Sequence, residues 1–399
     1  MACLWLGGCQ SGVRPESPGQ ENPTLVVSQR SALHREVWKT VFDTYYDPQL
    51  NGVDWINVGR ETHEMLADAE DVEAVYAVLK SMVERLGDPH TYVLSPAEVS
   101  ALETSGFVGV GLTSSEHESM EGVSVVLRVS PESPAASAGI EPGWLWLNAR
   151  EVNAASLTLG SVTTYRFLDD HEQIREYALE SAIVPKANDQ REVRWVGDQI
   201  LYLRFDYFEE GIADWMAEAL AQHAELNGLI LDVRWNPGGF KRELDAMLSL
   251  LLPENSAIGS VVTRRDRQLP EFTPSSYARP PINVPVAVLV SPYSASSSEI
   301  LAAVIRHHRR GPIVGTGRTS GQVLFSPAWK LPAGGLLKVA ARDYLSPDGK
   351  RLQGSGVGPD VITDPRSFFE FRRGVDPTLS AAIERLHKWG ENSQHRVSL

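Results

Sequence analysis

Four serines stand close together directly after an apolar run of the sequence. The run Val284–Val290 has the composition of a buried strand, and Ser294, Ser296, Ser297 and Ser298 come before the next apolar helical pattern. A strand that leads directly into a helix leaves backbone N–H groups at the turn, and these favour developing negative charge. A serine at such a turn can attack a carbonyl group beside an oxyanion site. The alternative is that these serines only cap the helix.

Two other stretches carry groups that acyl transfer would need. Gly238 and Gly239 follow the apolar run Gly228–Val233, and glycine amides can come close to another group because no side chain intervenes. His90 lies in the turn Gly87–Thr91 after a predicted helix, and an imidazole can take and return a proton near neutral pH. Taken alone, the glycines fit a plain turn and the histidine fits a solvated loop.

The elements that must position these groups follow from hydrophobic periodicity. The pattern predicts an α/β (α+β) chain with a helical N-terminal region, a β-rich middle domain and an α/β core with a mixed sheet. The predicted boundaries are a leader and tether at 1–27, helices at 28–103, the β domain at 104–190, the core at 191–370, and a last helix and tail at 371–399.

Composition narrows the function classes. The 399 residues carry a net charge of -14, which argues against nucleic acid as a partner. No apolar run is long enough to cross a bilayer as a helix. Only Cys3 and Cys9 are present, so a disulfide framework is not expected. We expect no metal and no cofactor.

The first residues suggest export. Leu6–Cys9 resembles a bacterial lipoprotein cleavage box, with Cys9 as the lipidated residue, although the segment before it is short and lacks a basic start. A polar Pro/Gly/Ser-rich stretch, Gln10–Pro23, follows as a tether would. We expect an exported protein of the cell envelope or periplasm, whose membrane contact is a lipid anchor.

The middle domain carries its own resemblance. Ser133–Leu145 reads Ser-Pro-Ala-Ala-Ser-Ala-Gly-Ile-Glu-Pro-Gly-Trp-Leu and resembles the PDZ domains of bacterial proteases, except that Trp144 replaces the usual Asp. PDZ domains bind the C-terminal end of a peptide as an added strand. The resemblance implies a carboxylate-binding loop formed by Phe107, Val108, Gly109, Val110, Gly111 and Leu112.

Six motifs in a fixed order carry a wider resemblance. They are Tyr46-Asp47-Pro48 with Asn51–Trp55, Leu86–Thr91, the PDZ-like stretch, Leu231–Gly239, Ser294–Glu299 and Gly356–Asp360. Together they resemble the carboxyl-terminal processing proteases, serine peptidases of the tail-specific and tricorn-core superfamily. The resemblance implies that Ser296 is the nucleophile and Glu299 the motif glutamate. The oxyanion donors would be the Ser297 amide and a glycine amide of Gly238-Gly239.

One departure changes the expected mechanism. The tail-specific branch uses a lysine as general base where this chain has Gln322, and glutamine cannot take a proton. The tricorn-like branch uses a histidine at the position of His90. We therefore expect His90 to activate Ser296. The third member would be Gln353, which stands where that branch has a glutamate, or Glu299.

The sequence therefore predicts a serine endopeptidase that recognises protein or peptide substrates with free C-termini. Two alternatives stay open. An inactive descendant would use the PDZ fold and the cleft as a scaffold for C-termini, and an esterase of the same fold would act on non-peptide substrates.

Overall fold

The structure is a computed structural model of the whole chain. It describes residues 27–103, 106–117, 120–152, 157, 159–185, 191–223, 225–265, 267–275, 277, 281–363 and 376–397. The predicted tether and Cys9 lie outside these residues. No helix in the described ranges is both long and apolar enough to cross a membrane.

The chain forms two compact units. One contains residues 1–100, 191–361 and 382–399, and the other contains residues 101–190 and 362–381. Their backbone elements mix helices and sheets, as the sequence predicts.

The first unit begins with helices. Their bounds are α1 (Val27–Thr44), α2 (Trp55–Met65), α3 (Val72–Glu84) and α4 (Pro96–Glu103), with short 3-10 helices η1 (Leu50–Gly52) and η2 (Leu66–Asp68) and the strand β1 (Tyr92–Leu94). Asp54 and Asp71 start α2 and α3 by accepting hydrogen bonds from Asn57 N (3.0 Å) and Ala74 N (2.8 Å). Such caps stabilise a helix by about 1 kcal/mol each.

The chain from residue 191 onward alternates strands and helices. Its elements are β9 (Arg191–Val196), β10 (Ile200–Phe205), α6 (Ile212–Gln222), β11 (Gly228–Asp232), α7 (Lys241–Leu251), β12 (Ala257–Thr263), β13 (Gln268–Phe272), β14 (Val286–Val290), α8 (Ser297–His307), β15 (Ile313–Gly315), β16 (Ala328–Lys330), η4 (Pro332–Gly334), β17 (Leu336–Lys338), β18 (Arg342–Leu345), β19 (Val361–Ile362) and α10 (Pro377–Val397).

A six-stranded mixed sheet organises this part, in the order β19-β15-β14-β11-β10-β9. The pairs β10–β11, β11–β14 and β14–β15 are parallel, and β9 is antiparallel to β10. All five residues of β11 and of β14 are buried, as expected for parallel strands covered on both faces. Ligand sites of such sheets form at the carboxyl ends of the strands.

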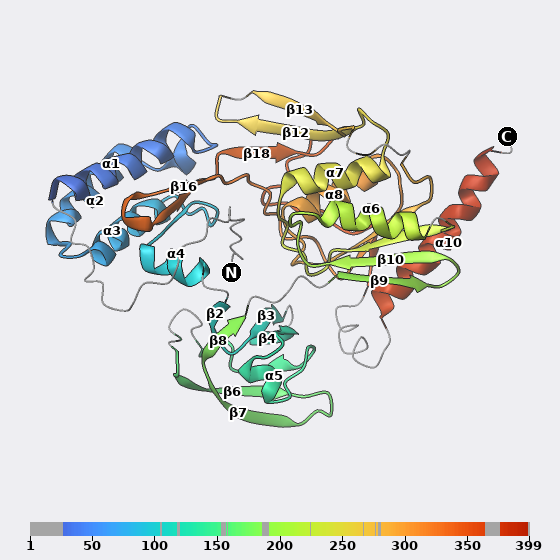
Figure 1. Cartoon of the computed structure of the whole chain (residues 1–399), viewed down its shortest axis with the longest axis horizontal. Coiled ribbons are helices and arrows are strands. Elements are labelled where there is room, and N and C mark those ends of the chain that lie inside the picture. Colours follow the sequence, from blue (N-terminus) through green and yellow to red (C-terminus); the bar gives the residue numbers. More distant parts are fainter. Residues whose placement is uncertain are drawn as a thin grey trace. The chain divides into compact units, whose positions relative to one another are not determined.

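Helices cover one face of the sheet (Figure 1). Alternate residues of the central strands, such as Leu203, Leu231 and Val288, join one buried core with the apolar sides of α6, α7 and α8. Each fully buried aliphatic side chain contributes about 1.5–3 kcal/mol. On the opposite face Leu386 of α10 reaches Gly228 at the start of β11, where a Cβ would lie 3.3 Å from it. The central strands are therefore fixed from both sides.

A small sheet joins the N-terminal helices to the segment after Gln322. It has the order β1-β17-β16, with Tyr92 opposite Lys338 and Val93 opposite Leu337. Val93 and Leu337 pack into the core of the N-terminal helices. A third sheet, β13-β12-β18, completes the unit.

The second unit is built mainly from strands. Its elements are β2 (Gly106–Gly109), β3 (Leu112–His117), β4 (Met120–Val129), α5 (Pro134–Ser137), β5 (Leu145–Trp146), β6 (Val162–Leu168), β7 (Ile174–Glu180) and β8 (Ala182–Pro185). β2 pairs with β8, and β3 is an edge of the sheet β3-β4-β5-β6-β7. Trp144, the departure from the PDZ pattern, is buried and packs near Phe167 and Tyr177.

Candidate active site

Ser296 lies in the turn between β14 and α8, at the carboxyl edge of the parallel strands. Its backbone has φ 53° and ψ -117°, a conformation that costs a non-glycine residue energy and that persists only when its surroundings hold it. The Ser296 N–H donates to Gln322 O at 2.9 Å and to the Glu299 carboxylate at 3.0 Å. The sharp turn therefore presents the Ser296 side chain at the start of α8.

Glu299 is a completely buried carboxylate that joins this turn to a second loop. One oxygen accepts from Thr319 Oγ1 at 2.6 Å and from Gly321 N at 2.7 Å. The other accepts from Ser296 N and, at 2.8 Å, from Gln322 N. Burial raises the pKa of Glu299, and the four donors oppose that shift only in part. Glu299 thus positions the serine, and none of its hydrogen bonds involves His90.

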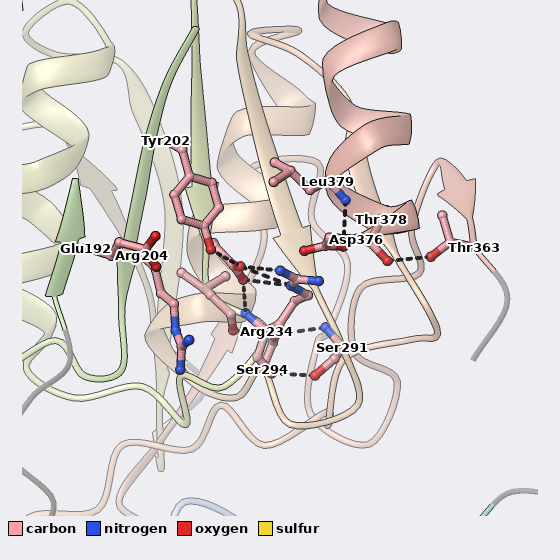
Figure 2. A network of polar contacts seen from close by, with 12 residues as sticks. Glu192, Tyr202, Arg204, Arg234, Ser291, Ser294, Thr363, Asp376, Thr378 and Leu379 are labelled. Atoms are coloured by element: carbon pink, nitrogen blue, oxygen red, sulfur yellow. Dashed lines mark hydrogen bonds and ion pairs between the residues drawn. The ribbon is translucent and has the colours of Figure 1, made fainter. Parts of the chain in front are cut away.

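The loop after β11 is anchored by a buried ion pair. Asp232 accepts from Tyr202 Oη at 2.6 Å and from Arg234 Nη2 at 2.6 Å. Burial alone would raise the pKa of Asp232, but the Arg234 charge and these hydrogen bonds hold it below its usual value. Figure 2 shows Tyr202 and Arg234 with Ser291 and Ser294 of the neighbouring turn.

Hydrogen bonds join this loop to the serine turn residue by residue. Ser291 Oγ donates to Arg234 O, and Ser294 Oγ donates to Val233 O at 2.8 Å. Asn236 O accepts from Ala295 N at 3.2 Å and from Ser298 Oγ at 2.8 Å. Ser291, Ser294 and Ser298 therefore hold the two loops together, while Ser296 is the half-buried N-cap residue of α8.

Gly238 lies against Ser296. A Cβ on Gly238 would come within 2.5 Å of Ser296 Cβ, and the residue has φ 106°, so only glycine fits. The Gly238 N–H is already used, because it donates to Asn236 Oδ1 at 2.8 Å. No described residue accepts a hydrogen bond from the N–H of Gly239 or of Ser297. Ser297 Oγ donates to Gly239 O at 3.2 Å, which keeps these two residues together.

Gln322, which stands where the resemblance expects a lysine, contacts the site through its main chain. Gln322 uses its N–H and its carbonyl oxygen to hold Glu299 and Ser296, and the residue is exposed. The two lysines that follow in the sequence lie in the small sheet. Lys330 is exposed, and Lys338 Nζ lies 5.7 Å from the centre of the Tyr92 ring, where burial lowers the pKa of Lys338. Neither lysine has a described hydrogen bond to Ser296.

His90 lies on the loop after α3, and the Tyr46–Trp55 motif helps to build that loop. Asn51 Nδ2 donates to Leu86 O and to Tyr45 Oη, both at 2.9 Å. The His90 side chain is 17% exposed, and its Nδ1 lies 3.2 Å from Asp88 Oδ1. Sequence reasoning did not select Asp88, although its position in the same short motif as His90 was a local signal.

One segment connects the His90 loop with the serine turn. At its start Gln322 O accepts from Ser296 N, and near its end Ala340 N donates to Thr91 Oγ1 at 3.0 Å. Gln353 Oε1 accepts from Val323 N at 2.9 Å, so Gln353 supports this segment. No described hydrogen bond joins Ser296 with His90, or His90 with Gln353.

Comparisons with known proteins agree with this architecture. The profile of peptidase family S41 matches residues 199–363, which include the serine turn and the glycine loop. The chain is 27% identical to the carboxyl-terminal-processing protease of Synechocystis sp. over 393 residues, covering 92% of this chain and 89% of that protein.

Residues 199–363 form a peptidase family S41 domain. The chain is also 27% identical to carboxyl-terminal-processing peptidase 3, chloroplastic, of Arabidopsis thaliana, covering 87% of this chain and 70% of that one. The solved photosystem II D1 C-terminal processing protease has the same fold, with a TM-score of 0.63 and 23% identity over 84% of this chain and 93% of that one.

The predicted family is thereby confirmed, and with it the enzyme class. The protein is a hydrolase, a serine-type peptidase whose homologues are carboxyl-terminal processing peptidases. The matched family segment begins after residues 101–190, so the PDZ assignment stays a prediction. The roles of individual site residues are likewise predictions.

Proposed function

We propose that this protein is an exported endopeptidase in which Ser296 is the nucleophile and His90 is the general base in place of the family lysine. The observation that carries the proposal is the Ser296 turn. It combines a strained serine, a glycine pressed against that serine, and two neighbouring amides that have no acceptor among the described residues.

The amides of Gly239 and Ser297 are the oxyanion donors in this proposal. Both are backbone groups in the two loops that the hydrogen bonds described above hold together. They therefore need no rearrangement when negative charge develops. Gly238 has a different role here, because its own N–H is taken by Asn236. Its lack of a side chain lets the glycine loop approach Ser296.

His90 is the base because the alternative positions lack a suitable group. Gln322 cannot accept a proton, and its main chain already holds the nucleophile. One ring nitrogen of His90 faces Asp88, which leaves Nε2 for the serine proton. The proposal requires Nε2 to come within hydrogen-bond reach of Ser296 Oγ when substrate is bound.

The reaction proceeds in two stages of acyl transfer. Ser296 Oγ attacks the scissile carbonyl carbon while its proton moves to His90 Nε2, and the carbonyl oxygen becomes the oxyanion. His90 then gives that proton to the leaving amine as the C–N bond breaks, which leaves an acyl-enzyme. The same nitrogen then takes a proton from water as the water oxygen attacks the ester carbon. It gives that proton to Ser296 Oγ as the ester C–O bond breaks, which releases the acid.

The second unit selects substrates in this proposal. β3 is an edge strand, so a peptide can add beside it. The N–H groups of Val110 and Gly111 have no acceptor among the described residues, and they stand where the predicted loop would bind a carboxylate. Phe107, Val108 and Gly109 pair with β8, and Leu112 begins β3. Location in the cell envelope or periplasm, with a lipid at Cys9, completes the proposal.

A binding scaffold is the second candidate, and one observation favours it. No described hydrogen bond links Ser296 Oγ to a titratable side chain, as expected if the site had lost its base. A scaffold would keep C-terminal recognition without cleavage.

The test is labelling of the full-length protein with a fluorophosphonate, alongside Ser296→Ala, His90→Ala and Gln322→Ala. We expect labelling that requires Ser296 and His90 but not Gln322, followed by cleavage of peptides. Folded wild-type protein that does not label would support the scaffold. Turnover of small esters without peptide cleavage would instead indicate an esterase.

A further inference from the structure

A carboxylate lies directly beside the proposed base. Asp88 Oδ1 accepts a hydrogen bond from His90 N at 2.9 Å and lies 3.2 Å from His90 Nδ1. The Asp88 side chain is only 5% exposed, against 17% for His90. The carboxylate therefore contacts the histidine through both its backbone and its ring, in a place that water reaches poorly.

The other oxygen of Asp88 is fixed from a second direction. Asp88 Oδ2 accepts from Thr91 Oγ1 at 2.7 Å, and Thr91 Oγ1 accepts from Ala340 N at 3.0 Å. Ala340 follows the small sheet that reaches back to Gln322. The orientation of the carboxylate thus depends on the same segment that holds the Ser296 turn.

The charges around the pair favour an ionised Asp88. Burial alone would raise the pKa of Asp88, but hydrogen bonds from His90 and Thr91 outweigh it and hold the pKa below its usual value. The nearby Tyr45, directly after α1, stays a neutral phenol, because burial and the Asp88 charge raise its pKa far above the working range. Asp47, in the turn after α1, also acts on Tyr45 and has no bond to His90.

We propose that Asp88 is the acidic positioning partner of His90. An ionised carboxylate can only accept, so the imidazole must carry its proton on Nδ1 and present Nε2 as the acceptor for Ser296. When Nε2 takes the serine proton, Asp88 stabilises the imidazolium and itself stays unprotonated. This inference rests on the proposed role of His90 as base.

The residues predicted for this role are engaged elsewhere. Gln353 accepts from Val323 N, and both oxygens of Glu299 are bonded to the turn and the 319–322 loop. Asp88 is the carboxylate that the described structure places on the His90 ring.

The test compares inactivation rates of full-length variants with a fluorophosphonate, which reports serine activation without peptide binding. We expect Asp88→Asn to slow inactivation by about 10²–10⁴-fold. The imidazolium would lose its counter-charge, and the neutral ring would no longer be restricted to the tautomer protonated at Nδ1. Asp88→Glu should recover part of that loss. Asp43→Asn is the matched control, since it makes the same chemical change at an exposed position of α1 whose carboxylate pairs with Lys39, and it should react like wild type.

The pH profile separates positioning from a merely structural role. Removing the Asp88 charge disfavours the imidazolium, so the acid-side midpoint of the inactivation rate should move to lower pH in Asp88→Asn. Thr91→Val removes a support of the loop but keeps the charge, so it should lower the melting temperature and leave that midpoint in place. A wild-type midpoint in Asp88→Asn would contradict the inference.

Nitrogen-15 NMR of labelled histidines gives a readout that does not depend on activity or on a variant at position 88. With the His90 signal assigned by its loss in His90→Ala, we expect a ring protonated at Nδ1. A ring protonated at Nε2 would overturn the inference. If the fluorophosphonate inactivated Asp88→Asn at the wild-type rate but did not react with His90→Ala, the inference about Asp88 would be overturned and the proposed base would stand. Wild-type inactivation of His90→Ala would overturn both.

Discussion

The Glu299 carboxylate accepts a hydrogen bond from the backbone N–H of Ser296 at 3.0 Å, three residues before it in the chain. The same oxygen accepts from Gln322 N at 2.8 Å. The strained backbone of the nucleophile is therefore held by a buried carboxyl group that also fixes the loop on its other side.

Replacing Glu299 by Gln should loosen this arrangement. The amide nitrogen of glutamine would face N–H donors, and each buried donor left without an acceptor costs about 1–3 kcal/mol. We expect a lower melting temperature and slower fluorophosphonate inactivation. Glu218→Gln, an exposed position on α6, is the control and should change neither. Full reactivity of Glu299→Gln would show that the hydrogen bonds of the Glu299 carboxylate are not needed to position Ser296.

Gly238→Ala should abolish serine reactivity. The new Cβ would lie 2.5 Å from Ser296 Cβ, so the glycine loop and the nucleophile must separate. Gly349→Ala is a matched control, because Gly349 also has positive φ but a Cβ there would meet nothing within 4 Å. That variant should lose only about 1–2 kcal/mol of stability and keep its reactivity. Equal reactivity of the two variants would contradict the close approach described here.

A lysine at position 322 should replace the histidine base. The double variant His90→Ala/Gln322→Lys should regain part of the reactivity that His90→Ala loses, since the 322 side chain is exposed and its backbone already holds the serine. Because a lysine must be neutral to accept a proton, recovery should increase toward alkaline pH. Inactivation rates from pH 6 to pH 10 would measure this, with His90→Ala/Gln322→Met as the control. No recovery at any pH would mean that position 322 does not reach the serine.

The Asp232–Arg234 pair should make stability depend on pH in a defined direction. The pKa of Asp232 is lowered in the folded protein. The ionised side chain therefore contributes to the free energy of unfolding at pH values above the ordinary carboxyl pKa, and this contribution is lost as pH falls through the lowered pKa. Asp232→Asn should be less stable than wild type by about 3–5 kcal/mol at pH 7, because Arg234 keeps a buried charge. In urea unfolding the difference should stay constant from pH 7 to pH 5 and narrow below about pH 4. A stability difference between wild type and Asp232→Asn that grows as pH falls would show that the pKa of Asp232 is raised, and not lowered, in the folded protein.

Recognition of C-termini has a test inside the second unit. A side chain on Gly111 would overlap Ser133, whereas one on Gly139 would meet nothing within 4 Å, and both glycines have positive φ. Gly111→Ala should therefore weaken binding of peptides with a free carboxylate at least about tenfold more than Gly139→Ala does. Fluorescence anisotropy with free and amidated peptides would measure it. Equal affinity of wild type for both peptides would refute carboxylate recognition.

Local sequence patterns predicted the central strands well. The apolar run Gly228–Val233 contains β11, and the run ending at Val290 contains β14. The strand Gln268–Phe272 was missed because it is an exposed edge with a proline in its centre. β1 and β17 pair across more than 240 residues, as in Tyr92 with Lys338, and no local pattern carries such a pairing.

The site was predictable to the same extent. Ser296 and the two glycines follow strands, so their edge of the sheet could be anticipated. The hydrogen bond from the Gly238 N–H to Asn236 could not be anticipated, because it depends on the shape of the folded loop. Asp88 could have been found, since an aspartate that accepts from the N–H two residues later is a common turn.

Gln322 holds Ser296 through its carbonyl oxygen and Glu299 through its N–H, and both are groups that nearly every amino acid has. The identity of the side chain at this position is therefore separable from the geometry of the nucleophile. A chain of this architecture can exchange one proton acceptor for another by single substitutions, passing through intermediates whose serine turn is still correctly formed.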